Sequence, residues 1–155
     1  MIGKQKYTTQ SVLYNGLGEQ LNQKHPLYIL SHGINWQIFE HEFSKYYSSK
    51  MGAPSKPIRL MVSLLILKHV RNLSDENLVE QWSENCYYQY LSGEQNFQPK
   101  IPCVPTELVA FRKRIGEAGV EPILKESIRI NKANDDKTAN SRHCIFQQKR
   151  NDKMV

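Results

Sequence analysis

The chain has 155 residues, a hydrophobic fraction of 39% and a formal net charge of +6. This length is typical of one domain, and the composition is that of a globular protein rather than of a disordered chain. The longest apolar run, residues 60–67, is far shorter than the ~20 residues that cross a bilayer, and no secretory signal begins the chain. We therefore expect a soluble, cytoplasmic protein without a membrane partner.

Residues 1–24 are polar and show little periodicity, which predicts a mobile lead-in. Ordered structure is expected from His25 onward. Asn35 is a suitable N-cap for a helix over about 36–47, because aromatic residues then recur at helical spacing. Those aromatic positions are Trp36, Phe39, Phe43 and Tyr46 or Tyr47.

The segment 51–57 is a predicted linker, and Pro57 suits the first turn of the helix expected over about 57–71. That helix is apolar on nearly every side, which is typical of a helix buried among others, so we place it at the centre of a bundle. Replacing Leu64 or Leu65 should therefore destabilise the fold strongly, whereas replacing Arg59 should cost much less.

His69 falls on the same face of this helix as Leu65. We expect it to be a hydrogen-bonded core histidine rather than a metal ligand. Ser74 is the predicted N-cap of the next helix, and Leu73 and Leu78 fit a hydrophobic staple around it.

The remaining elements are expected to be short. A helix over 86–91 precedes a proline-rich stretch, 97–105, that cannot be a regular helix. Thr106 caps a helix over about 107–115 that Gly116 ends. A last helix is expected over about 120–130, with a proline in its first turn.

No segment alternates apolar and polar residues over strand length, so the fold class is all-α, a compact bundle of five or six helices. From Asn131 onward the chain is polar and mixed in charge, and we expect little order there. The predicted organisation is a lead-in over 1–24, a helical domain over 25–130 and a disordered tail over 131–155.

The predicted helix after Thr106 has a basic outer surface. Residues 101–155 carry eleven basic and seven acidic side chains, which suggests an anionic partner such as nucleic acid. At ~100° per residue Lys113 points away from the core, and Arg112 and Arg114 flank the apolar stripe. In helix-turn-helix domains, too, short capped helices pack on a buried helix and present a recognition helix to DNA. An ordinary solvated face would have the same pattern, so spacing alone leaves both interpretations open.

Nothing in the sequence points to an active site or a cofactor. Cys86, Cys103 and Cys144 lie too far apart for the paired ligands of a zinc site, and the five histidines form no His-x-x-x-His pair. Asp135 and Asp136 fall in the polar tail, where no fold would hold them around a metal ion. We expect no catalytic residue, no metal site and no cofactor.

The chain resembles the InsH-type N-terminal domain of bacterial insertion-sequence transposases. The resemblance runs from about His25 to Asn131. It is carried by GAPSKPIRLMVSLLILKHVRNLSDENLVEQWSENCYYQYLSGEQNFQ followed by IPCVPTELVAFRKRIGEAG. In that family the domain precedes a ribonuclease-H-like catalytic domain with an Asp-Asp-Glu metal site, and it is thought to bind the terminal inverted repeats of the element.

The resemblance implies which residues contact DNA. Arg112, Lys113 and Arg114 are the best candidates, and Arg59, Lys68 and Arg71 follow them. The sequence departs from the family after Ile130, because residues 132–155 match no catalytic segment. This implies a truncated or frameshifted copy, with the tail out of frame, that is not an enzyme by itself.

Two functions of different classes remain open. The first is a DNA-binding fragment of a transposase that recognises terminal repeats in double-stranded DNA, at the nucleoid. The second is a protein-interaction domain that oligomerises with full-length transposase, or with itself, and binds DNA little.

Overall fold

The computed structural model describes residues 16–47 and 55–151, and the side chains of its last helix up to Ile130 and at Lys132. These residues form seven helices and no strand, which confirms the all-α prediction. In chain order, the helices are α1 (Leu17–Gln20), α2 (Pro26–Gly33), α3 (Trp36–Ser44), α4 (Ile58–Arg71), α5 (Asp75–Glu84), α6 (Cys86–Leu91) and α7 (Pro105–Asn151).

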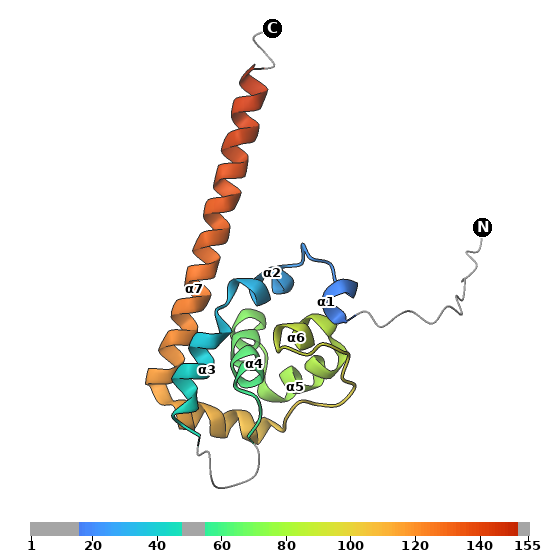
Figure 1. Ribbon diagram of the computed structural model, residues 1–155, viewed down its shortest axis with the longest axis vertical. Coiled ribbons are helices and arrows are strands. Elements are labelled where there is room, and N and C mark those ends of the chain that lie inside the picture. Colours follow the sequence, from blue (N-terminus) through green and yellow to red (C-terminus); the bar gives the residue numbers. More distant parts are fainter. Residues whose placement is uncertain (1–15, 48–54, 152–155) are drawn as a thin grey trace, which may run out of the picture.

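Helix α4 is the centre of the bundle, as predicted, and contacts α3, α5, α6 and α7 (Figure 1). Every residue from Leu60 to Leu67 is buried. The one polar residue in this run, Ser63, donates a hydrogen bond from Oγ to the carbonyl oxygen of Leu60 at 2.7 Å. A helix without a polar face is stable in water only when its neighbours cover it on all sides.

The turn from α4 to α5 has the predicted N-cap, Ser74, and ends α4 with a cap that was not predicted. Asn72 ends α4 in the left-handed conformation, with φ 51°, which asparagine tolerates better than most residues. The Oγ of Ser74 accepts a hydrogen bond from the backbone N–H of Asn77 at 3.2 Å. Leu78 is fully buried and Leu73 packs against the core, in agreement with the expected staple.

The N-terminal boundary was predicted wrongly. The described structure begins at Gly16 rather than at His25, and residues 1–15 lie outside the described part of the chain. Leu17 in α1 is buried, and its N–H donates to the carbonyl oxygen of Gln95 at 2.8 Å. Helix α2 was also missed, because its N-cap is a histidine: His25 Nδ1 accepts from the N–H of Leu27 at 3.2 Å.

His69 is exposed, so the expectation of a core histidine is wrong. The last turn of α4 extends past the helices that cover the rest of it, and Val70 and Arg71 are exposed with His69. Helical periodicity places a residue on a face, but it does not show where the neighbouring helices stop.

The proline-rich connection between α6 and α7 is held by one buried side chain. Gln89 is fully buried. Its amide Nε2 donates to the carbonyl oxygens of Trp82 and Gln98 at 3.0 and 2.7 Å, and its Oε1 accepts from the N–H of Gln98 at 2.7 Å. In this irregular segment the Gln89 side chain thus supplies the backbone of Gln98 with hydrogen bonds that a helix or sheet would otherwise provide.

Helix α7 consists of two helical segments joined at Gly116, whose φ of 61° and ψ of −169° are not helical. This confirms the predicted break at that glycine. The expected disorder from residue 131 is not met, because the backbone is helical through Asn151. Residues 131–151 contain neither glycine nor proline, and extending an existing helix needs no new nucleus.

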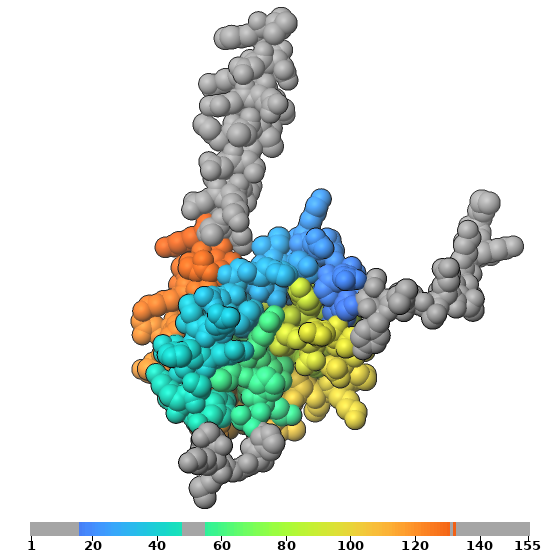
Figure 2. Space-filling model, viewed as in Figure 1, coloured from blue at the N-terminus to red at the C-terminus, as the bar shows by residue number. Residues whose placement is uncertain are grey.

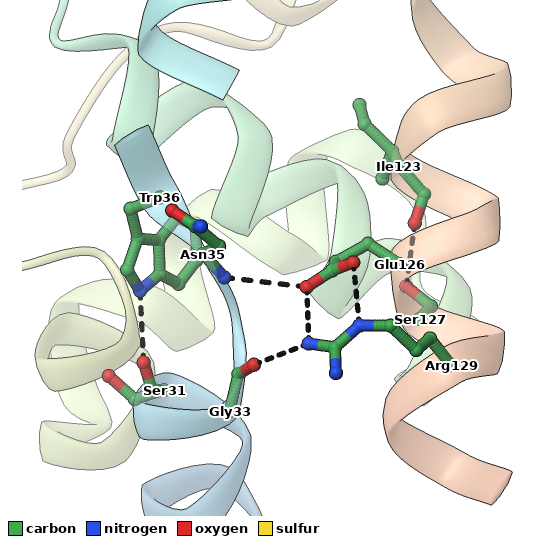
Figure 3. A network of polar contacts seen from close by, with 8 residues as sticks. All are labelled: Ser31, Gly33, Asn35, Trp36, Ile123, Glu126, Ser127 and Arg129. Carbon is green, nitrogen blue, oxygen red and sulfur yellow. Dashed lines mark hydrogen bonds and ion pairs between the residues drawn. The ribbon is translucent and has the colours of Figure 1, made fainter. Parts of the chain in front are cut away.

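The second segment of α7 packs against the joint between α2 and α3. Arg129 donates to the carbonyl oxygen of Gly33 at 2.8 Å, and Glu126 accepts from the N–H of Asn35 at 3.4 Å. Figure 3 shows both contacts. Arg129 and Glu126 are also ion-paired with each other at 2.6 Å. Ile130 is buried beside Gly33, and in Figure 2 the orange surface of α7 borders the blue-to-cyan surface of α2 and α3.

None of the described helices is both long and apolar enough to cross a membrane.

Candidate nucleic-acid interface

The first segment of α7 has the predicted division into an inner and an outer face. Leu108, Phe111 and Ile115 are buried in the core. Lys113 is exposed on the outer side. This arrangement holds the helix firmly by its apolar stripe and leaves its basic side facing the solvent.

Arg112 and Lys68 are held in an ion cluster with Asp75. The guanidinium of Arg112 donates from Nη1 and Nη2 to the two carboxylate oxygens of Asp75 at 2.8 and 2.7 Å. Lys68 Nζ lies 2.7 Å from Oδ1 of the same carboxylate. The Arg112 guanidinium, with Lys68, keeps the pKa of Asp75 well below its usual range, and the carboxylate in turn raises the pKa of Arg112. Two of the six candidate cations therefore join α4, α5 and α7 to one another.

The charge of Asp75 should make a pH-dependent contribution to stability. We expect Asp75→Asn to lower the free energy of unfolding at neutral pH by about 1–3 kcal/mol, because a neutral amide cannot balance two cations. The folded-state pKa is below the unfolded value of ~3.9, so this contribution is complete above that pH and is lost as the pH falls through the folded-state pKa. Urea denaturation of wild type and variant should give a difference that shrinks below pH ~4. A difference that stays constant into strong acid would contradict the assignment to the carboxylate charge.

Arg59, a third candidate, is partly buried between helices. Its Nε donates to the carbonyl oxygen of Leu91 at 3.2 Å, and its Nη2 donates to Ser31 Oγ at 3.2 Å and to the carbonyl oxygen of Tyr90 at 3.5 Å. Its Cζ lies 4.6 Å from the centre of the Trp36 ring. Burial lowers the pKa of this guanidinium, but an arginine stays charged. Arg59 thus connects α2, α4 and α6 to one another.

Lys113, Arg114 and Arg71 are the candidates whose charged ends reach the solvent. All three are exposed, and none forms an ion pair with another residue that the structure describes. The guanidinium of Arg114 lies 4.9 Å from the centre of the Tyr47 ring. Stacking on an aromatic ring orients a guanidinium and leaves its edge free to donate hydrogen bonds.

Taken as a whole, the described bundle is almost neutral. Residues 16–47 and 55–132 carry thirteen basic and twelve acidic side chains. Helix α5 follows α4 after a short turn, as the second helix of a helix-turn-helix would, but it exposes Glu76, Glu80 and Glu84. Phosphates repel such a surface, so the first segment of α7 is the better candidate for a contact with DNA.

Among the residues whose side chains are described, the cysteines and histidines form no second site. In the described ranges, no three His, Cys, Asp or Glu side chains lie together where they could hold a metal ion. Burial raises the pKa of Cys103 to about 11, so its thiol is protonated and unreactive at neutral pH. Cys144, Asp135 and Asp136 lie where the structure describes no side chains.

Comparisons with known proteins identify the family. Residues 16–114 match the model of the family described as "Transposase domain (DUF772)". Over 108 residues the chain is 41% identical to "Uncharacterized protein ORF8 in nfe locus" of Rhizobium meliloti. The matched region covers 70% of this chain and 52% of that protein. The chain thus spans about half the length of this relative, and no solved structure matches it. Because the family model covers well over half of its residues, the chain belongs to the DUF772 transposase domain family.

Proposed function

We propose that this chain binds double-stranded DNA through the outer face of the first α7 segment and, as part of transposition, recognises the terminal repeats of an insertion sequence. The observation that carries the proposal is the exposure of Lys113 and Arg114 on a helix whose opposite face is fixed in the core. We place this binding in the cytoplasm, at the nucleoid, and we propose that the 155-residue chain neither cuts nor joins DNA by itself.

The two side chains suit different parts of a DNA contact. Lys113 projects from a firmly packed helix, and its flexible ammonium suits a phosphate, which carries no sequence information. Arg114 is oriented by Tyr47, and a planar guanidinium donates in pairs either to a phosphate or to the O6 and N7 atoms of guanine. Arg71 is the remaining exposed candidate, at the end of α4. Because Arg112, Lys68 and Arg59 are engaged within the fold, we propose no direct role for them.

The expected result is salt-dependent binding that is weakened when Lys113 and Arg114 are removed. We expect Lys113→Ala/Arg114→Ala to weaken binding and to reduce the salt slope by about one unit for each lost phosphate contact. If Arg114 contacts a base, its loss should cost about 1–3 kcal/mol on a terminal repeat and much less on a scrambled duplex. Fluorescence anisotropy at several salt concentrations measures both effects, and the same duplexes should stay intact when Mg²⁺ is added.

A matched variant controls for the change in net charge. Lys45→Ala/Lys125→Ala also removes two cations, but each of these is exposed and lies beside a glutamate, Glu42 or Glu121. This control should bind DNA like the wild type. Equal binding by a folded Lys113→Ala/Arg114→Ala variant would move the DNA contact to another surface.

Association with intact transposase is the second candidate function. It is favoured by three exposed apolar side chains on α7, Val109, Leu124 and Ile128. Self-association that is insensitive to salt, in a chain that does not bind DNA, would favour this function over the first.

A further inference from the structure

The arginines in the described part of the chain differ in what their guanidiniums contact. Three of them, Arg59, Arg112 and Arg129, donate hydrogen bonds to acceptors within the fold. Arg71 and Arg114 are exposed, and their guanidiniums form no hydrogen bond or ion pair with another residue of the described ranges. Of these two, Arg114 is the one whose guanidinium lies over a described aromatic ring.

The ring beneath Arg114 is held in place by the end of α3. The backbone N–H of Tyr47 donates to the carbonyl oxygen of Ser44 at 3.1 Å, and the half-buried side chain of Tyr47 packs against the core. Four residues earlier, the buried ring of Phe43 meets the ring of Phe111 edge to face, with centroids 6.1 Å apart. Phe111 lies three residues before Arg114 on α7, so this contact keeps the Tyr47 ring beside Arg114.

Stacking prepares Arg114 for an acceptor that binds in a plane. An arginine side chain has many rotamers, and a bidentate contact restricts it to few of them. The Tyr47 ring fixes the plane of the guanidinium in advance and leaves its edge, which carries the N–H donors, open. Arg71 has no such support among the described rings, and the ammonium of Lys113 has no plane to orient.

We propose that Arg114 reads a guanine in the major groove of DNA and that Tyr47 is its positioning residue. Guanine presents two neighbouring acceptors, O6 and N7, that match the paired donors of an arginine. This inference rests on the proposed DNA binding and adds the base that is read and the residue that prepares its reader. A phosphate also accepts from both donors, so the test has to distinguish the two acceptors.

The test removes one guanine acceptor and leaves every phosphate unchanged. Selection from a library of random duplexes with the wild type gives a preferred site. The guanines of that site are then replaced one at a time by the deaza analogue, in which a C–H group takes the place of N7. At one position the wild type should bind the analogue roughly 10-fold or more weakly. Arg114→Ala should bind both duplexes equally.

Arg114→Lys separates the charge of this residue from its planar shape. Lysine keeps the attraction for phosphates but lacks the fork that matches guanine. This variant should therefore be insensitive to the analogue, while the salt dependence of its binding stays like that of the wild type. Fluorescence anisotropy measures both quantities on the same duplexes.

Variants of Tyr47 test its role as a positioning residue. Tyr47→Leu keeps apolar bulk but has no ring, so it should lose the sensitivity to the analogue and keep the salt dependence of the wild type. Tyr47→Phe keeps the ring and should discriminate like the wild type. Tyr46→Leu is the matched control, because Tyr46 also packs half-buried against the core but its ring lies beside Lys45, 5.3 Å from Nζ. This control should discriminate like the wild type, and circular dichroism checks that each variant is folded at the assay temperature.

The outcomes separate this inference from the proposal on which it rests. Salt-dependent binding that no guanine replacement weakens would overturn the guanine contact and leave DNA binding in place. A weakening that Arg114→Ala shares with the wild type would overturn the assignment to Arg114. Discrimination that Tyr47→Leu retains would overturn the role of Tyr47. A wild type that binds no duplex even at low salt would overturn the proposed function and this inference with it.

Discussion

Replacing Leu64 by alanine is expected to lower the free energy of unfolding by ~2–5 kcal/mol, the usual cost of emptying a buried leucine site. Leu64 has no exposed surface and lies in the middle of α4, where helices on all sides cover it. The loss includes the transfer of the side chain to water and the cavity that rigid neighbours cannot fill. Leu65, which is 3% exposed, should behave in the same way. Urea denaturation followed by circular dichroism measures the difference.

Val70→Ala is the control for this experiment. Val70 belongs to the same helix, but it is 54% exposed, so its truncation should change stability by no more than about 0.5 kcal/mol. If Leu64→Ala and Leu65→Ala both unfold like the wild type, α4 is not the centre of the bundle.

Replacing Arg59 by alanine should have the next largest effect, about 2–4 kcal/mol, because a charged group with several buried partners is removed. The variant loses the stacking on Trp36 and leaves the carbonyl oxygen of Leu91 without its donor. This corrects the expectation from the sequence that Arg59 contributes much less than the neighbouring leucines. A charged residue at the edge of an apolar helix looks like a surface residue until its partners on other helices are known.

Arg59→Lys separates the charge of Arg59 from its geometry. Lysine keeps the positive charge, but it cannot donate from a planar fork or stack in the same way. We therefore expect Arg59→Lys to recover only a small part of the lost stability in the same denaturation assay. Full recovery would show that charge alone accounts for the role of Arg59, and a stable Arg59→Ala variant would show that the internal hydrogen bonds contribute little.

The sequence predicted the parts of the fold that have local causes. The apolar run of α4, the Ser74 cap and the break at Gly116 each depend on residues within one or two turns. The buried stripe of the first α7 segment follows from periodicity alone. Helix α1 was missed because it has only four residues and is held by Gln95, far away in the chain.

The site was less predictable, because its chemistry depends on contacts between distant residues. Asp75 lies in the first turn of α5, where acidic residues are favoured in any helix. Nothing in its neighbourhood indicates that it pairs with Arg112, 37 residues further on. The sequence shows how many cations a helix carries, but the partners of Arg112 and Lys68 decide which cations are available to bind DNA.

The contact between Arg129 and Gly33 joins residues 96 positions apart, and this has a consequence for the synthesis of the protein. Helices α2 and α3 leave the ribosome early, but the residues that cover their joint are translated almost a hundred positions later. Contacts over such separations form late, since the loop between them must close first. The nascent chain must therefore keep the α2–α3 joint uncovered until Ile130 has emerged. A gene fragment that stops at residue 114, where the family match ends, would encode a chain in which that joint is never covered.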